Sequence, residues 1–235
     1  MPDILLFGAT GYTGKLTART LARRGASFAI AGRDRSKLEA LAGETGDPEI
    51  HVAAVGDTDA LVRALEGTRA LITCVGPFAE LGETAVEAAF RAGVHYVDST
   101  GEGTFIRDLI DTRGRAAEEA GIAMAPALGF DEVPADVAVT LAVEGMEDPE
   151  LVLTYALPSN GSSGTVKSGI GILLSSAPWR VNGQVVEVRA GEHQRWAPMP
   201  PPLGPQSSLS FPFAETHLAP LHLNLRSFRT FATVG

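Results

Sequence analysis

The chain has 235 residues, of which 45% are hydrophobic, and its formal net charge at pH 7 is −9. This length suffices for one large domain, or for an ordinary domain with a smaller partner. The acidic charge balance argues against a general nucleic-acid surface, which needs a basic face. One cysteine, Cys74, excludes an internal disulfide. No apolar run approaches the roughly 18 residues of a membrane span, and the opening residues lack the pattern of a signal peptide. We therefore expect a cytoplasmic protein without a membrane span.

Up to residue 148, short apolar runs rich in Ile and Val alternate with amphipathic stretches of helical length. The runs that we expect to form strands are Ile4–Phe7, Phe28–Ala31, Ile50–Val55, Ala70–Val75, Tyr96–Val97 and Ile122–Ala125. The stretches that we expect to form helices are Thr13–Arg24, Ser36–Thr45, Thr58–Leu65, Glu80–Ala92, Thr104–Ala120 and Pro134–Val143. Gly25, Gly93 and Gly121 each follow a helix, where a left-handed residue is wanted. Buried strands alternating with helices predict the α/β class, with a doubly wound Rossmann parallel sheet.

After Pro149 the pattern changes, which predicts two domains, residues 1–148 and residues 149–235. The second would be a smaller α+β region that serves substrate binding or dimerisation. Its expected features are a strand at Leu151–Leu157, a weak helix at Gly164–Ser175, a hairpin at Arg180–Val188, an extended loop at Trp196–Pro205 and a strand at His222–Thr233. The hairpin prediction depends on Asn182-Gly183, a dipeptide typical of type I′ turns. The loop prediction depends on five prolines.

The strongest motif follows the first predicted strand and opens the first predicted helix. It reads Gly8-Ala9-Thr10-Gly11-Tyr12-Thr13-Gly14. Gly8 would let the chain turn off the strand, Gly11 would let the backbone approach a pyrophosphate, and Gly14 would let the helix pack on the sheet. The helix N-terminus then offers N–H groups to phosphates. The alternative is a tight turn without a ligand; a P-loop for ATP is excluded because Leu16 follows Lys15.

The end of the second strand favours NADP over NAD. An NAD site places an acidic side chain there for the ribose hydroxyls, whereas this chain has Gly32-Arg33-Asp34-Arg35, with Lys37 following. Arg33 can stack on adenine while its guanidinium holds a 2′-phosphate. Asp34 could instead reach a hydroxyl. The alternative is a solvated charge cluster in which Asp34 or Ser36 caps the next helix.

Three later strand ends fall at the same edge of the predicted sheet, where ligands of such folds bind. Cys74 to Phe78 should line the cofactor, so we include Val75, Gly76, Pro77 and Phe78 among its contacts. The other two strand ends supply carboxylates, and a reduction needs a proton donor near the substrate. The candidates are Asp98, Glu102 and Asp131.

Each of these carboxylates also has an alternative role. Glu102 could be a satisfied polar group, and Asp131 could cap the helix that begins near Pro134. Tyr96 is a further donor candidate, although its strand position favours packing.

Several segments together resemble the saccharopine dehydrogenase-like oxidoreductases, a family that includes saccharopine reductases and trans-acting enoyl reductases. The matching segments are Gly8–Gly14, Ala31–Arg33, Val75–Phe78, Tyr96–Glu102 and Gly129–Asp136. The resemblance implies an NAD(P)-binding Rossmann domain and a second domain that often mediates dimers, so a homodimer is expected. It also implies a cofactor role for Gly8, Thr10, Gly11, Tyr12, Thr13, Gly14, Arg33, Val75, Gly76 and Pro77. Members of the family are typically longer than this chain.

Other oxidoreductase types lack their signatures here. None of the tyrosines, Tyr12, Tyr96 and Tyr155, has a lysine four residues later, which excludes the Tyr-x-x-x-Lys dehydrogenases. Cys74 is expected to be a small buried hydrophobe. The histidines form no metal-binding pattern, because His217 and His222 straddle Pro220.

Two function classes remain. The first is an NADP(H)-dependent oxidoreductase acting on a small amino-acid-like (imine) or enoyl/acyl substrate. The second is a non-catalytic NADPH-binding sensor or interaction module.

Overall fold

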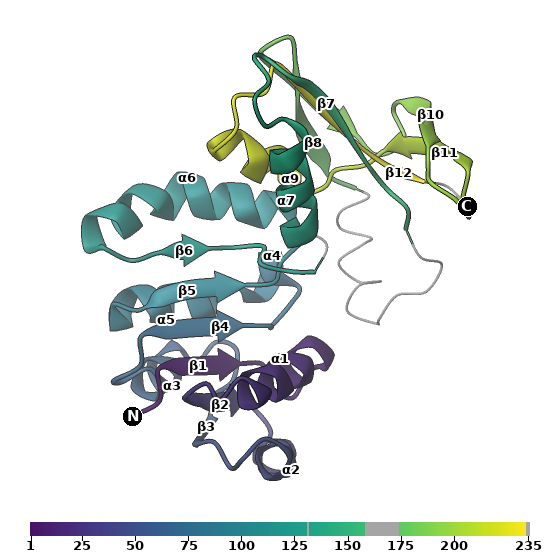
Figure 1. Ribbon diagram of the computed structural model, residues 1–235. Coiled ribbons are helices and arrows are strands. Elements are labelled where there is room, and N and C mark those ends of the chain that lie inside the picture. Colours follow the sequence, from purple (N-terminus) through teal and green to yellow (C-terminus); the bar gives the residue numbers. More distant parts are fainter. Residues whose placement is uncertain (131, 158–173, 234–235) are drawn as a thin grey trace. The chain divides into compact units, whose positions relative to one another are not determined.

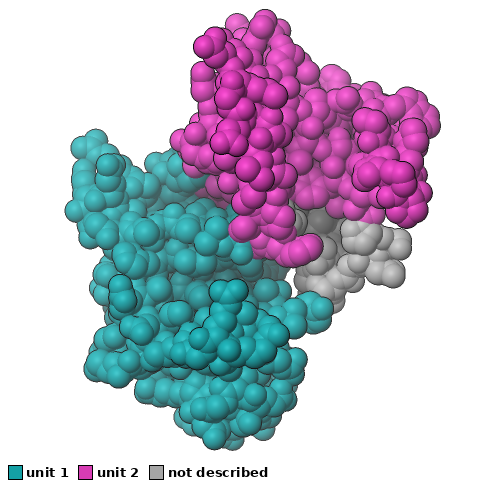
Figure 2. All heavy atoms as spheres, in the orientation of Figure 1, with its two compact units in different colours: residues 1–100, 108–128 teal, residues 101–107, 129–235 magenta. Residues whose placement is uncertain are grey.

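The computed structural model describes residues 1–130, 132–157 and 174–233. These residues form two compact units, coloured separately in Figure 2. Unit 1 consists of residues 1–100 and 108–128, and unit 2 consists of residues 101–107 and 129–235. The expected domain boundary after residue 148 differs from this division, because the helix that begins at Glu132 packs in unit 2.

Unit 1 contains a six-stranded parallel sheet in the order β3-β2-β1-β4-β5-β6 (Figure 1). Its strands are β1 (Ile4–Phe7), β2 (Phe28–Gly32), β3 (Ile50–Val52), β4 (Ala70–Thr73), β5 (His95–Asp98) and β6 (Met124–Ala125). The central strand β1 pairs with β2 on one side and β4 on the other, so Ile4 lies opposite both Phe28 and Ala70. The order reverses at β1, which confirms the doubly wound sheet and puts the switch point after Phe7.

The helices of unit 1 lie along the faces of this sheet. They are α1 (Tyr12–Arg23), α2 (Arg35–Glu44), α3 (Thr58–Ala64), α4 (Phe78–Leu81), α5 (Glu83–Ala92) and α6 (Gly103–Ala120), whose first turn belongs to unit 2. The expected helix Glu80–Ala92 is therefore two helices, joined at Gly82. Gly25, Gly93 and Gly121 have φ values of 66°, 67° and 68°, which confirms the predicted left-handed helix ends.

One apolar cluster holds the opening βαβ segment together. Leu6 and Ile30 from β1 and β2 pack with Ala18 of α1 and Leu38 of α2, and all four are fully buried. Fully burying a leucine or isoleucine side chain stabilises the folded state by about 1.5–3 kcal/mol. The loop between β1 and α1 is thus held at both ends by the core.

Unit 2 is built on a second sheet, with the order β10-β11-β12-β8-β9 and with β7 also paired to β12. Its strands are β7 (Glu150–Tyr155), β8 (Ser176–Val181), β9 (Gln184–Arg189), β10 (Gln194–Pro198), β11 (Pro205–Ser210) and β12 (Ser227–Thr233). Its helical segments are α7 (Glu132–Ala142), α9 (Glu215–Leu218) and the 3-10 turn η1 (Ala219–Leu221). This arrangement confirms the expected α+β character. Val139 and Val143, at the end of α7, pack against Phe228 of β12.

Two local predictions in unit 2 are confirmed. The expected strand at Leu151–Leu157 is β7, and the expected hairpin is β8 and β9. Its turn residues Asn182 and Gly183 have φ values of 50° and 78°, as a type I′ turn requires. The expected helix at Gly164–Ser175 lies almost wholly outside the described residues.

Two other predictions were wrong in part. Trp196 lies in β10 rather than in a loop, because prolines interrupt only the end of the β10–β11 pair, where Pro198 faces Pro205. A proline is tolerated at a strand end because the ladder needs no N–H there. The strand expected from His222 begins at Ser227 instead. Leu223 and Leu225 do alternate with polar residues, but they pack in the apolar cluster that contains Val139 of α7 and do not pair in a sheet.

Among the described residues, none of the helices combines the length and the apolar character that crossing a membrane would require.

Candidate cofactor site and acid–base groups

The glycine loop is shaped by close approaches that leave no space for side chains. Gly8 has φ +79°, and a Cβ there would lie 2.6 Å from Val75 Cγ2. A Cβ on Gly14 would lie 2.8 Å from the Cα of Ala9. Both positions therefore require glycine. Because they carry no side chains, the start of α1 can lie close to the end of β1, and the end of β1 can lie close to the segment after β4. This is the role that the sequence predicted for the first and third glycines.

The middle glycine differs, because its surroundings are open. A Cβ on Gly11 would have only the Gly8 carbonyl oxygen within 4 Å, at 3.3 Å. Gly11 is the N-cap of α1 and offers no side-chain cap. The backbone N–H groups of Tyr12, Thr13 and Gly14 have no acceptor among the described residues. An open space lined by N–H groups at a helix N-terminus fits a diphosphate, so the residues present match a dinucleotide.

The end of β2 lies beside this loop. A Cβ on Gly32 would be 3.8 Å from Thr10 Oγ1, so the two segments are near neighbours. Arg33 is exposed and forms no ion pair with any residue that the structure describes. Its guanidinium is therefore available for a 2′-phosphate.

Asp34 has the capping role that we gave as its alternative. It is the N-cap of α2, and its Oδ1 accepts a hydrogen bond from the Lys37 backbone N–H at 3.1 Å. Its Oδ2 lies 3.2 Å from Lys37 Nζ. The backbone hydrogen bond from Lys37 lowers the pKa of Asp34 below its usual value, so the carboxylate is charged at neutral pH. A cofactor contact by Asp34 or Lys37 remains a prediction.

The segment after β4 also reaches the loop. The Val75 side chain lies where a Cβ on Gly8 would be, and Gly76 and Pro77 follow Val75 along the chain. Phe78 behaves differently, because its side chain is buried at the start of α4 and lies against Gly76. The structure thus brings Val75, Gly76 and Pro77 to the switch point, while the Phe78 ring packs in the interior.

Asp98, our first candidate proton donor, is buried at the end of β5 with 1% of its surface exposed. Its Oδ1 accepts hydrogen bonds from the backbone N–H groups of Thr100 and Ala127, each at 2.9 Å. Its Oδ2 accepts one from the Tyr96 hydroxyl at 2.7 Å. Both oxygens therefore hold neighbouring segments in place. Burial and the nearby Asp98 charge raise the pKa of Tyr96 far above its usual value, so this phenol stays neutral.

The other two carboxylates are less fully described. Glu102 is buried in unit 2, and its carbonyl oxygen accepts a hydrogen bond from the Ile106 N–H at 3.1 Å in the first turn of α6. Asp131 lies outside the described residues. Catalytic roles for both remain predictions.

The structure shows two contacts that the sequence analysis did not predict. In unit 2 the Tyr155 hydroxyl donates a hydrogen bond to Glu215, and His217 lies against Gly103. No spacing rule relates these residues, which come from three separate segments. His217 had been considered only as a metal ligand; within the described part of the chain, no group of three candidate ligands could hold a metal ion.

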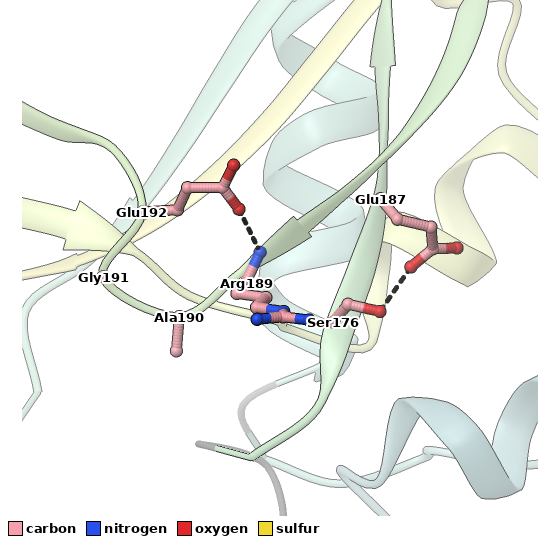
Figure 3. Close-up of a pocket in the computed structure, with 6 residues that line it drawn as sticks. All are labelled: Ser176, Glu187, Arg189, Ala190, Gly191 and Glu192. Carbon is pink, nitrogen blue, oxygen red and sulfur yellow. Dashed lines mark hydrogen bonds between the residues drawn. The ribbon is translucent and has the colours of Figure 1, made fainter.

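Unit 2 also has a surface hollow of about 590 Å³, shown in Figure 3. It is lined by Ser176, Glu187, Arg189, Ala190, Gly191 and Glu192. Its carboxylates are engaged locally: Glu187 accepts a hydrogen bond from Ser176 at 2.5 Å, and Glu192 accepts one from the Arg189 backbone N–H at 2.9 Å. These contacts account for the two carboxylates of the hollow.

Comparison with known proteins agrees with the glycine-loop geometry. The sequence model of the family described as "Saccharopine dehydrogenase NADP binding domain" matches residues 4–125, about half of the chain. The chain belongs to this family. Its first unit is therefore an NADP-binding domain, which confirms the cofactor predicted from Arg33.

Two named relatives are mycobacterial proteins. A protein of Mycobacterium tuberculosis, provisionally assigned as a trans-acting enoyl reductase, is 39% identical over 144 residues. The trans-acting enoyl reductase of Mycobacterium ulcerans is 36% identical over 143 residues. Each match covers 58% of this chain and 34% of the relative, so the chain matches about a third of the length of these proteins.

The fold of the whole described chain also has a known counterpart. Saccharopine dehydrogenase (L-Glu forming) from Saccharomyces cerevisiae superimposes with a TM-score of 0.67 at 19% identity. The match covers 99% of this chain and 55% of the yeast chain. At this identity the likeness establishes the fold alone.

The open space over Gly11 of this NADP-binding domain leads to the first prediction. Gly11→Ala should raise the Kd for NADPH at least about tenfold, because the new methyl group occupies the phosphate approach. The free energy of unfolding should change by less than about 1 kcal/mol, since alanine fits this backbone conformation. Calorimetric titration and urea unfolding measure the two effects. Gly43→Ala, at an exposed position of α2 with open surroundings, is the control. Unchanged NADPH affinity in Gly11→Ala would contradict the phosphate cradle.

The unpaired Arg33 leads to the second prediction. Arg33→Ala should weaken NADPH binding by about tenfold or more, which is ~1.4 kcal/mol, and should affect NADH binding much less. Arg35→Ala is the matched control, because Arg35 is directed to Glu39 along α2. The Kd values for both nucleotides are measured by fluorescence titration. Equal losses for the two nucleotides would contradict the assignment of Arg33 to the 2′-phosphate.

The hydrogen bonds of Asp98 lead to the third prediction. Asp98→Asn should lower the free energy of unfolding by about 3 kcal/mol, because a neutral amide keeps one acceptor oxygen and loses the stronger hydrogen bonds that a charged carboxylate accepts. Asp111→Asn, on the exposed face of α6, should be neutral. Urea unfolding measures both variants. Wild-type stability in Asp98→Asn would show that the contacts of this carboxylate do not anchor the end of β5.

Proposed function

We propose that this protein is an NADP(H)-dependent oxidoreductase that transfers hydride to or from an enoyl or acyl thioester, with a small amino-acid-like imine as the other substrate class. The observation that supports it most directly is the row of N–H groups at Tyr12, Thr13 and Gly14 beside the open Gly11. That cradle binds a diphosphate, and Arg33 selects the phosphorylated nucleotide. A bound nicotinamide supplies hydride chemistry, which no side chain can provide.

The preference for enoyl substrates comes from the relatives. Two of them carry the name trans-acting enoyl reductase, with identities of 39% over 144 residues and 36% over 143 residues. The imine class comes from the resemblance to saccharopine reductases in the sequence, and it stays in the proposal as the second panel of substrates. The homodimer expected from the resemblance also stays a prediction.

The experiment that tests this function is NADPH oxidation against two panels, one of enoyl thioesters and one of keto acids supplied with amines. We expect turnover with an enoyl thioester. The kcat/KM for NADPH should exceed the value for NADH by about tenfold or more, because Arg33 would bind the 2′-phosphate that only NADPH carries. Arg33→Ala should remove most of this preference. Tight NADPH binding with no turnover on either panel would contradict the proposal and would favour the non-catalytic NADPH-binding module.

A further inference from the structure

The strand β9 stands at one end of the second sheet, and among the described residues it pairs only with β8. Its apolar side chains Val185 and Val186 are 62% and 44% exposed. Edge strands in proteins commonly carry a lysine, a proline or a bulge, which prevents pairing with another chain. This edge has neither lysine nor proline, and its pairing with β8 is continuous. It is therefore open to a further strand.

The hairpin geometry determines which backbone groups of β9 face away from β8. Residues of an antiparallel pair alternate between those that exchange hydrogen bonds with the partner strand and those that do not. The two-residue turn makes Val181 and Gln184 an exchanging pair, so every second residue of β9 after Gln184 also bonds to β8. Pro178 lies opposite Glu187 and agrees with this alternation, because a proline has no N–H to exchange.

The outward-facing residues are Val185, Glu187 and Arg189. Arg189 is already satisfied: its N–H donates to the Glu192 side chain at 2.9 Å (Figure 3), and its carbonyl oxygen accepts a hydrogen bond from the Ser210 hydroxyl at 2.8 Å. The outward N–H and C=O groups of Val185 and Glu187 have no partner among the described residues. The free part of the edge is therefore confined to these two residues.

These free groups are complementary to the same groups of a second copy. A twofold axis through Val186 places Val185 of each copy opposite Glu187 of the other, and each such pair exchanges two hydrogen bonds. All of the free groups are then used. An axis at Glu187 would oppose two like charges and would need the Arg189 N–H, which Glu192 occupies. An axis at Val185 would leave the groups of Glu187 unpaired, beside the turn.

The side chains on both faces of β9 also fit this register. On one face, Val186 would meet Val186 of the second copy, with a Cα–Cα distance of about 4.5 Å. On the other face, Glu187 lies 3.5 Å from Arg107 within its own copy, so its charge is compensated. β9 contains one glutamate and one arginine, and is therefore neutral in a chain whose net charge is −9. Two such edges can meet without the repulsion expected between acidic surfaces.

We propose that two copies of this protein join their second sheets by antiparallel pairing of β9 about a twofold axis at Val186. The contact is smaller than the roughly 1,200 Å² that stable interfaces bury, so we expect a reversible dimer with a Kd on the order of 10 μM. This inference gives a surface to the expected homodimer. It involves unit 2 alone and does not depend on the proposed reduction.

A disulfide test examines the twofold axis. Val186→Cys should form an intermolecular disulfide under mild oxidation, because the two Cα atoms at the axis would lie within disulfide range. Val52→Cys is the matched control: this valine lies in β3, at an edge of the first sheet, and is 45% exposed. Cys74 stays in both variants, and the wild type measures its contribution. The disulfide dimer should form at least about tenfold faster in Val186→Cys. Equal rates in the two variants would overturn the proposal.

A backbone test separates the edge N–H from the side chain that it carries. Glu187→Pro removes an outward N–H and no bond to β8, whereas Glu187→Ala loses the same side chain and keeps the N–H. Sedimentation velocity from about 1 to about 300 μM measures the Kd of each dimer. Glu187→Ala should stay within about threefold of the wild type, and Glu187→Pro should raise the Kd by about tenfold or more.

A third variant guards against a local effect of the proline on folding. Val186→Lys places two like charges at the axis and should also raise the dimer Kd by about tenfold or more. Urea unfolding checks that each variant is folded. A dimer whose Kd is unchanged in both Glu187→Pro and Val186→Lys would place the interface elsewhere and overturn the proposal. A wild type that stays monomeric at about 300 μM would also overturn it, and would leave the edge to an extended strand of another protein.

Discussion

The site depends on a steric constraint, the close approach of backbone at Gly8 and Gly14. At these two positions a single methyl group would collide with Val75 or Ala9, so the absence of side chains lets β1, α1 and the end of β4 converge. Gly11 is the glycine that packing does not require, and it is the one that we predict to face the ligand. Packing glycines and a ligand glycine thus alternate within seven residues, and the contacts around each one distinguish them.

Buried carboxylates fix local geometry within each unit. Asp98 ties the end of β5 to the segment after β6 through its bonds to Thr100 and Ala127, while Tyr155 and Glu215 secure α9 in unit 2. At Asp98 the carboxylate is removed from water and both of its oxygens accept hydrogen bonds, which makes the local geometry precise at the cost of desolvation. The acidic residues that resemble catalysts in the sequence can therefore be parts of the scaffold.

Features of this fold that depend on residues close in sequence could be predicted, whereas contacts between distant residues could not. The glycine loop, the alternation of strands and helices in unit 1 and the Asn182-Gly183 turn were predictable, because backbone conformation and hydrophobic period determine them within a few residues. The pairing of β10 with β11 was missed because the prolines in this segment favoured a loop, whereas the strand continues as far as Pro198. The capping bond of Asp34 remained one of two options, since Asp fits both roles. Contacts such as His217 with Gly103 join residues more than a hundred positions apart, and no periodicity encodes them.

The position of β12 in the second sheet has a consequence for assembly during synthesis. This strand pairs with β7, β8 and β11, and its Phe228 fills the cluster beneath α7. On the ribosome, α7 and β7 emerge long before β12, so their apolar surfaces stay exposed until that strand has been synthesised. Unit 1 can already form by then, because its neighbouring strands are closer in sequence. Such delayed long-range pairing slows folding and exposes chains to aggregation. Unit 2 should be the part of this protein that most needs protection by chaperones.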